Sequence, residues 1–336
     1  MTEDEGKKVY FEDVLDGFLE GGIDTEKAMV LFSGAGDPEN ARKLFSAASS
    51  VRNASLGRKL AVTAHIHMIT RCAVDPPCLY CSLSSRDEPI REERQVLSDD
   101  ELSRYAEFAV SRGVKSIVLV GGTDLAGSDT CVRRAVESIR RIADVDIALD
   151  VGPSFSRETA IWLKGKGVST VYCSVETVNR AAFAEAKPGD NLQARMNFIG
   201  MLQNEGLKIG SVVMDGLGNE RDLIDSILYH TSFSNLAYLY ISTFHPVPGT
   251  PWSSRDAASL QKSLIALSIA RLAFPGVHLG LAEVEVEDPG SVSRLESQLM
   301  AGGGNSVAGL LLYSKKTVDN TEQIRLRASR VGFETT

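Results

Sequence analysis

The sequence predicts an α/β protein, a TIM-type (β/α)8 barrel with an N-terminal helical extension. Two observations indicate this fold. From Lys59 onward, short apolar, β-branched runs alternate with helical patterns, which is typical of parallel strands buried on both faces. The 336 residues also exceed the roughly 250 of a single barrel. We therefore predict a helical lead-in over residues 1–58, a barrel over 59–314 and a C-terminal tail over 315–336. An open, doubly wound sheet is the alternative.

Three helices are predicted in the lead-in. The stretch YFEDVLDGFLEG is apolar at helical spacing and ends in a glycine pair, and Asp24 then caps TEKAMVLFSG. Asp37 as N-cap and Pro38 at the first helical position introduce a third helix, which we expect to end at Gly57.

The barrel is predicted from strand-like runs separated by amphipathic segments. Ser98 begins a capping box with Glu101, and Ser156 is the expected N-cap of another helix. The eight predicted strands are 60–68, 115–121, 146–152, 170–176, 208–214, 236–243, 277–283 and 306–313. Because a barrel carries its chemistry at the carboxyl ends of its strands, functional residues are expected just after these runs. The tail is polar and suggests no role.

Composition narrows the class of protein. Hydrophobic residues make up 43% and charged residues 24% of the chain, as in a soluble globular protein. We expect a cytoplasmic protein without membrane contact, because no apolar run approaches about 20 residues and the start MTEDEGKK is unlike a signal peptide. The net charge of −8 argues against nucleic acid and favours a small-molecule substrate.

Three of the five cysteines, Cys72, Cys78 and Cys81, lie within ten residues in RCAVDPPCLYCSLSSRDEP. They follow the first predicted strand directly, and such spacing indicates a metal site. Zinc requires four N/S ligands, and the nearby candidates for a fourth, His65 and His67, lie inside the strand. Three thiolates suit a [4Fe–4S] cluster that leaves one iron open.

The cluster and its position resemble the radical S-adenosylmethionine (SAM) superfamily, in which three cysteines hold a [4Fe–4S] cluster and SAM chelates the fourth iron. Tyr80, before the last cysteine, matches as well. The resemblance covers nearly the whole chain and favours the branch with biotin synthase and the hydrogenase-maturation and pyrrolysine-pathway enzymes. It implies that a low-potential donor, ferredoxin or flavodoxin, drives reductive cleavage of SAM to a 5′-deoxyadenosyl radical.

The gap between Cys72 and Cys78 holds five residues, where the superfamily usually has three. Pro76 and Pro77 fill it as a stiff, extended excursion. This C-x5-C-x2-C spacing is similar to the HcgA (HmdB) family of iron-guanylylpyridinol (FeGP) cofactor biosynthesis for [Fe]-hydrogenase in hydrogen-using methanogens. That resemblance implies a pyridinol precursor as substrate and other cofactor-biosynthesis proteins as partners.

Two alternatives stay open. One is a radical SAM enzyme of the biotin synthase, HydE or methylornithine mutase type with another small-molecule substrate. Biotin synthase itself is disfavoured because it needs ligands for a second cluster, and Cys131 with Cys173 is too small a set. The other alternative is a non-enzymatic, zinc-binding barrel.

The resemblance also implies residues that hold SAM. Gly121 and Gly122 in LVGGTD resemble the glycine-rich motif for the SAM amino group, and glycine lets the backbone approach a ligand closely. Thr123 stands where the family has an acidic residue, with Asp124 next to it as a replacement. A plain strand-to-helix turn is the alternative.

Ser174 and Glu176 alternate on one face of the strand predicted at 170–176, with Cys173 on the other. The resemblance implies that Glu176 binds the SAM ribose, beside Ser174. It also implies that Arg195 contacts the SAM carboxylate, with Arg180 as a second candidate. The alternative is that Glu176 simply pairs with one of these arginines.

Substrate candidates lie near several strand ends. They are His65, His67, His245, Glu283 and Tyr313. A strand histidine is more often a hydrogen-bonded core residue, and the acidic stretch near Glu283 also fits a solvated loop. Cys131 and Cys173 are expected to be structural thiols.

Overall fold

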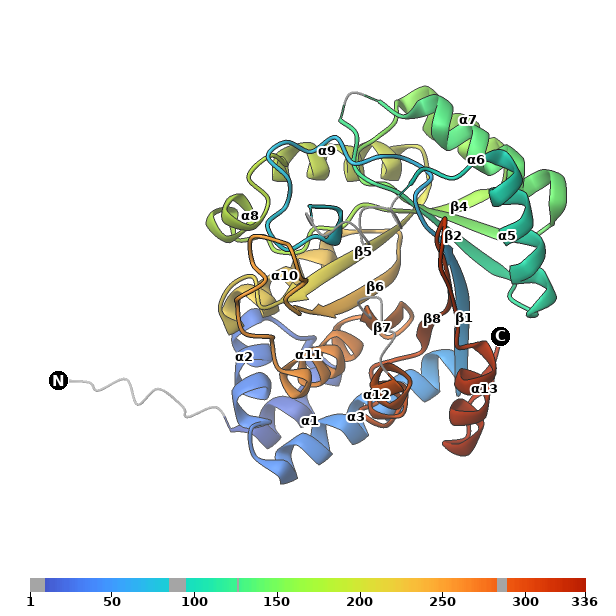
Figure 1. Cartoon of the computed structure of the whole chain (residues 1–336). Coiled ribbons are helices and arrows are strands. Elements are labelled where there is room, and N and C mark those ends of the chain that lie inside the picture. The colour runs from blue at the N-terminus through green and yellow to red at the C-terminus, as the bar shows by residue number, and fades with distance from the viewer. Residues whose placement is uncertain (1–9, 85–94, 126, 283–288) are drawn as a thin grey trace.

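The computed structural model describes residues 10–84, 95–125, 127–282 and 289–336. A curled, mostly parallel sheet lies at the centre and the helices lie outside it (Figure 1). The strands are β1 (Lys59–Ile66), β2 (Ser116–Val120), β3 (Asp146–Asp150), β4 (Val168–Tyr172), β5 (Lys208–Asp215), β6 (Leu236–Thr243), β7 (His278–Ala282), β8 (Ser306–Leu312), β9 (Thr317–Asp319) and β10 (Glu334–Thr335).

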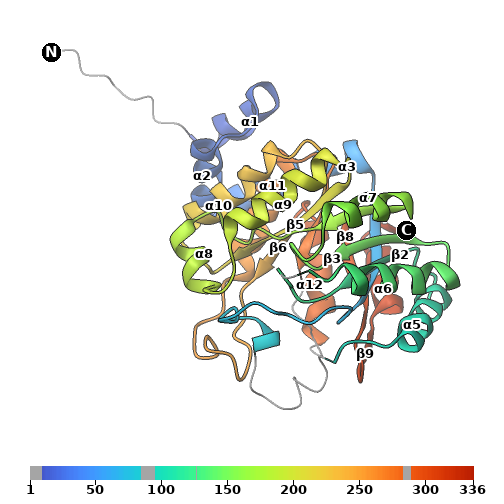
Figure 2. The same cartoon turned by 90° about the horizontal axis from the view of Figure 1, so that it is seen from above.

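The helices cover the outer face of the sheet, as the second view shows (Figure 2). None that the structure describes combines the length and hydropathy that a membrane span requires. The helices are α1 (Phe11–Gly21), α2 (Thr25–Gly34), α3 (Pro38–Leu56), α5 (Asp99–Ser111), α6 (Asp129–Ile142), α7 (Arg157–Gly165), α8 (Arg180–Ala186), α9 (Leu192–Asn204), α10 (Glu220–Tyr229), α11 (Leu260–Ala273), α12 (Pro289–Met300) and α13 (Thr321–Arg330), with short 3₁₀ turns η1 (Ser82–Ser84) and η2 (His230–Ser232).

The sheet contains all eight predicted strands within the described residues, in the order β7-β6-β5-β4-β3-β2-β1-β8, and neighbouring strands run parallel. No ladder joins β7 to β8 in this part of the chain. The prediction of a closed (β/α)8 barrel is therefore corrected to a curled sheet that stays open between β7 and β8.

Side-chain amides replace the missing ladder at this seam. The Leu279 N–H donates to Asn305 Oδ1 at 2.8 Å, and the Leu281 N–H donates to Gln298 Oε1 at 2.8 Å. Both amide side chains are fully buried. Between them, a Cβ at Gly280 would collide with the Ser306 carbonyl oxygen. Every buried N–H needs an acceptor, and here side chains outside the sheet supply it.

The lead-in forms three helices that pack beside α11 (Figure 1). The predicted caps are confirmed, because the Asp24 and Asp37 side chains accept from backbone N–H groups of their helices. The capping box of Ser98 with Glu101 and the Ser156 cap are also present. These local signals were sufficient because each cap satisfies N–H groups that have no partner within the helix.

The polar tail is built into the sheet. Strand β9 pairs antiparallel with β8, and β10 pairs parallel with β1. Ile324, Ala328 and Phe333 are buried beside β1 and β8. The sequence suggested no role for these residues because only a few apolar side chains, spread over a polar segment, make the contact.

We expect Asn305→Ala to lower the free energy of unfolding by about 1–3 kcal/mol, since it leaves the buried Leu279 N–H without an acceptor. Asn204→Ala, on an exposed turn of α9, is the matched control and should change it by less than about 0.5 kcal/mol. Chemical denaturation of both variants checks this, and equal stability of the two would contradict the role of Asn305 at the seam.

Candidate active site

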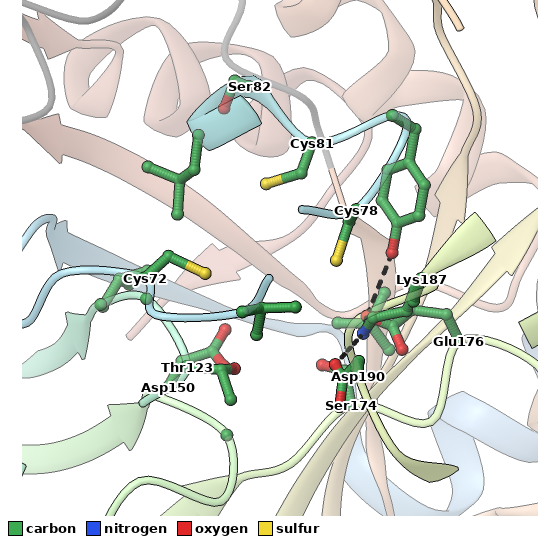
Figure 3. Close-up of a pocket in the computed structure, with 18 of the residues that line it drawn as sticks. Cys72, Cys78, Cys81, Ser82, Thr123, Asp150, Ser174, Glu176, Lys187 and Asp190 are labelled. Atoms are coloured by element: carbon green, nitrogen blue, oxygen red, sulfur yellow. Dashed lines mark hydrogen bonds and ion pairs between the residues drawn. The ribbon is translucent and has the colours of Figure 1, made fainter. Parts of the chain in front are cut away.

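Cys72, Cys78 and Cys81 line one cavity of about 310 Å³, called here the cysteine cavity, at the carboxyl ends of the strands. Figure 3 shows their sulfur atoms directed toward a common space. Cys72 is exposed, and Cys78 and Cys81 are half-buried. The loop after β1 thus brings together the three thiols that the spacing singled out.

Hydrogen bonds to three separate parts of the fold hold the cysteine loop in place. The Ala73 N–H donates to the Thr123 carbonyl oxygen after β2, and the Leu79 N–H donates to the Ala186 carbonyl oxygen at the end of α8, both at 2.8 Å. The Trp252 N–H donates to the Leu79 carbonyl oxygen at 3.0 Å. The loop is therefore attached on both sides of the cavity.

Two glycines let the cysteine loop pack closely against neighbouring backbone segments. A Cβ at Gly122 would collide with the backbone nitrogen of Cys72, and one at Gly189 would collide with the backbone of Asp75 and Pro76. The proline excursion, which contains a cis Asp75–Pro76 peptide bond, lies against the turn that carries Gly189. Gly122 is thus more than a plain turn residue, since its missing side chain makes room for the loop.

Glu176 lies on the wall of the cysteine cavity. Its Oε1 accepts from Lys187 Nζ at 2.8 Å and from the Tyr80 hydroxyl at 3.3 Å. Its Oε2 is buried and has no partner among the described residues. Strand β4 ends at Tyr172, so the prediction that Glu176 lies on the strand is wrong, and the side chain reaches the cavity from the following loop.

The alternative for Glu176, a pair with Arg180 or Arg195, is not what the structure has, because Lys187 is the ion-pair partner of Glu176. Arg180 is exposed at the first position of α8 and is not among the residues that line the cavity. Arg195 lines the cavity, but its guanidinium pairs with Asp190, with Nε to Oδ2 at 2.9 Å. Lys187 Nζ also lies 3.2 Å from Asp190 Oδ2.

These four side chains form a network of two cations and two carboxylates, called here the charge network: Glu176, Lys187, Asp190 and Arg195. Arg195 extends it to the Ser174 carbonyl oxygen at 3.0 Å and to Thr123 Oγ1 at 3.3 Å. Every member is at least nine-tenths buried or has a fully buried carboxylate. Figure 3 shows Lys187 between Glu176 and Asp190.

The network favours the charged forms of Asp190 and Lys187 despite burial. Burial opposes the charged form of Asp190, but Lys187 and Arg195 lower the pKa of Asp190 to about 2. Burial likewise opposes the charge on Lys187, yet Glu176 and Asp190 raise its pKa above the usual value. The cavity wall therefore presents fixed charges of both signs.

Three residues that were not predicted from the sequence complete the site. Lys187 and Asp190 belong to the KPGD turn between α8 and α9, and Asp150 ends β3 and lines the cavity. Burial raises the pKa of Asp150 to about 6. Its position at the carboxyl end of a predicted strand was the signal that could have found it.

The glycine-rich segment after β2 also borders the cavity. Gly121, Gly122 and Thr123 are lining residues, as are Tyr80 and Ser174. Asp124 is not one of them, and its Oδ2 accepts from the Ser128 hydroxyl at 2.8 Å. Thr123, not Asp124, is thus the residue of this segment that contacts Arg195.

The substrate candidates separate into two groups. His65, His67 and Tyr313 line a cavity deeper in the sheet, called here the inner cavity, and His67 also borders the cysteine cavity. His245 lines neither cavity, and its Nδ1 lies 2.8 Å from the Thr243 carbonyl oxygen. Glu283 lies outside the described residues.

The remaining cysteines lie away from the loop. Cys173 is fully buried in the core between the sheet and α9, where its Sγ lies 3.7 Å from the Arg195 carbonyl oxygen. Cys131 is on α6 and half-buried. Neither lines the cysteine cavity.

We expect Asp190→Asn to lower the free energy of unfolding by about 3–5 kcal/mol, because it leaves Lys187 and Arg195 buried with too few counter-charges. The folded pKa of about 2 lies below the unfolded value of about 3.9. The stabilisation by Asp190 is therefore present above about pH 4 and lost as the pH falls toward 2.

Denaturant titrations at several pH values measure this contribution. Asp256→Asn, at an exposed position, is the control and should leave stability and its acid dependence unchanged. An Asp190→Asn variant as stable as the control would show that the charge network does not stabilise the fold.

Comparison with known proteins agrees with this geometry. The family model of the radical SAM superfamily matches residues 66–227. Similar proteins include an uncharacterized protein of Methanocaldococcus jannaschii, 25% identical over 76% of this chain and 66% of its own length. The [FeFe] hydrogenase maturase subunit HydE of Thermotoga maritima is 25% identical over 67% of this chain and 63% of its own length. The chain thus spans slightly less than two thirds of the length of both relatives.

The fold is shared with solved structures of other proteins. The crystal structure of methylornithine synthase (PylB) superposes with a TM-score of 0.80 at 19% identity, covering 96% of this chain and 97% of that one. The similarity extends over the curled sheet and its helices. Residues 66–227 of the chain thus match the radical SAM superfamily, which implies a [4Fe–4S] cluster and S-adenosylmethionine as cofactors.

Proposed function

We propose that the protein binds a [4Fe–4S] cluster through Cys72, Cys78 and Cys81 and cleaves SAM reductively. The observation that carries this proposal is the convergence of three thiols on one cavity whose wall holds a buried, unpartnered carboxylate oxygen, Glu176 Oε2. When bound, the cluster and SAM supply one-electron chemistry that removes a hydrogen atom from a substrate.

The residues around the cavity fit a ligand with the polar groups of SAM. Glu176 Oε2 can accept from ribose hydroxyls, since an unpaired buried acceptor costs free energy until a donor reaches it. Arg195 lines the cavity and is held in place by Asp190. Its planar guanidinium suits the methionyl carboxylate of SAM. Gly121 and Gly122 line the same cavity, where the resemblance places the amino group. Ser174 and Tyr80 border the same space.

A single metal ion fits the cavity less well. Among the residues that the structure describes, no three His, Cys, Asp or Glu side chains lie close enough together to hold one ion. Structural zinc needs four such ligands around one point, whereas a [4Fe–4S] cluster distributes its cysteine ligands over several irons. The donor set therefore favours the cluster.

The proposed substrate is a precursor of the pyridinol ring of the FeGP cofactor, processed with a ferredoxin or flavodoxin as electron donor. The C-x5-C-x2-C spacing, with five residues between Cys72 and Cys78, supports this assignment through its resemblance to the HcgA family. A second candidate is another small molecule, favoured by the similarity to HydE and to methylornithine synthase.

We expect Cys72→Ala, Cys78→Ala and Cys81→Ala each to abolish cluster binding and formation of 5′-deoxyadenosine, because each removes one ligand. After anaerobic reconstitution, the unaltered chain should hold about four irons. Iron content and product formation under reducing conditions measure both effects. Cys131→Ala and Cys173→Ala are matched controls and should retain both. Normal SAM cleavage by any loop variant would refute the ligand assignment.

We expect Glu176→Gln to weaken SAM binding by about ten- to a hundredfold, the value of hydrogen bonds to a charged group. Calorimetric titration of the cluster-loaded protein with SAM measures it. Glu158→Gln, in the exposed first turn of α7, is the matched control. Equal SAM affinity of the two variants would exclude Glu176 from the SAM site.

Deuterium transfer separates the candidate substrates. Deuterated pyridinol precursors and deuterated amino acids are each incubated with the reduced, SAM-loaded protein, and the 5′-deoxyadenosine is analysed by mass spectrometry. Deuterium from a pyridinol precursor supports the FeGP pathway. Transfer only from an amino acid would favour the second candidate.

A further inference from the structure

The inner cavity has a volume of about 180 Å³ and lies beneath the cysteine cavity. Residues shared by both linings are His67, Val120, Asp150 and Val212. A molecule in the inner cavity therefore lies next to one in the cysteine cavity. The volume is below the roughly 300–1,000 Å³ of pockets for drug-sized ligands, so a molecule of about one ring fits best.

Aromatic rings line facing walls of the inner cavity. Tyr172 on β4 and Tyr240 on β6 are stacked with ring centroids 6.3 Å apart. His67 and Tyr313, which follow β1 and β8, are stacked with centroids 4.2 Å apart. In the curled sheet β5, between β4 and β6, lies across from β1. A slot between aromatic walls favours a flat, unsaturated ring.

The described lining of the inner cavity contains an acidic side chain but no permanently cationic one. Among the described residues that line it, Asp150 is the acidic residue and there is no Lys or Arg. Burial lowers the pKa of His65 to about 4, so that His65 is neutral at neutral pH. A carboxylate or phosphate in the inner cavity would find no Lys or Arg among the described lining residues, and burying such a charge unpaired is costly.

Asp150 has acceptor capacity available. Within the described part of the chain, no hydrogen bond or ion pair engages its carboxylate oxygens, although its backbone carbonyl accepts from the Gly121 N–H at 2.8 Å. Arg195, which also lines the cysteine cavity, is already paired with Asp190. A half-buried carboxylate of this kind is stabilised when a ligand donates to it.

We propose that the inner cavity binds the substrate as a small, flat heterocycle that carries no anionic group there, with a ring N–H or O–H donating to Asp150. This assignment rests on the proposed function for the identity of the neighbouring ligand, and it deepens that function by naming the substrate class. Asp150, on the boundary of both cavities, fixes which edge of the ring faces the cysteine cavity.

The proposal can be tested without the cluster. Ligand-observed NMR titration measures the binding of 2-pyridone to the full chain. We expect 2-pyridone to bind, and 1-methyl-2-pyridone and benzoate to bind at least about tenfold more weakly, since one lacks the donor and the other is anionic. Asp150→Asn should weaken 2-pyridone binding about tenfold, because it loses the charge-assisted hydrogen bond.

Asp146→Asn is the matched control, the same substitution at the exposed, opposite end of β3, and should bind 2-pyridone normally. Equal binding of 2-pyridone and its N-methyl analogue by the unaltered chain would overturn the proposal, and that comparison needs no variant. Stronger binding of benzoate than of 2-pyridone would overturn it too.

SAM affinity of the cluster-loaded Asp150→Asn variant distinguishes the two cavities. We expect the substitution to weaken 2-pyridone binding more than SAM binding, and a larger loss of SAM affinity than of 2-pyridone affinity would assign Asp150 to SAM and refute its role in the inner cavity. If the chain binds 2-pyridone through Asp150 but does not cleave SAM, the inner cavity is as proposed and the radical SAM function fails.

Discussion

The charge network of Glu176, Lys187, Asp190 and Arg195 is the interaction on which the rest of the site depends. Buried charges are tolerated only where partners are held in good geometry, so the network fixes the loop after β4 relative to α8 and α9. The turn that supplies Lys187 and Asp190 also carries Gly189, against which the proline excursion of the cysteine loop lies. One turn therefore positions both the thiols and the carboxylate that faces them.

The three thiols converge only when the sheet has formed, because the cysteine loop is held by segments from different parts of the sheet. The loop is attached to the end of β2 through Ala73 and to the end of α8 through Leu79. Those two attachments lie far apart in the sequence but come together because parallel strands end at the same edge. The cysteine cavity and the inner cavity are then stacked along the sheet interior, with Asp150 and His67 on their shared wall.

Local signals predicted most of the elements. The strands, the caps at Asp24, Asp37 and Ser156 and the capping box at Ser98 could all be predicted, because each depends on a few neighbouring residues. Whether the barrel closes could not be predicted, since it depends on which groups accept from the backbone N–H groups of β7 at the edge facing β8. There Asn305 and Gln298 provide acceptors that a β8 ladder would otherwise supply, and no local pattern marks those amides.

The sequence by itself determined that three closely spaced cysteines follow the first strand of an α/β fold, at the edge of the sheet where the strands have their carboxyl ends. It determined these features because spacing and periodicity are properties of the chain. Only the tertiary structure decided that Lys187 pairs with Glu176, that Arg180 stays outside the cavity and that Asp150 borders both cavities. Ion-pair choice depends on distances between loops from different strands, and those distances exist only once the sheet has curled.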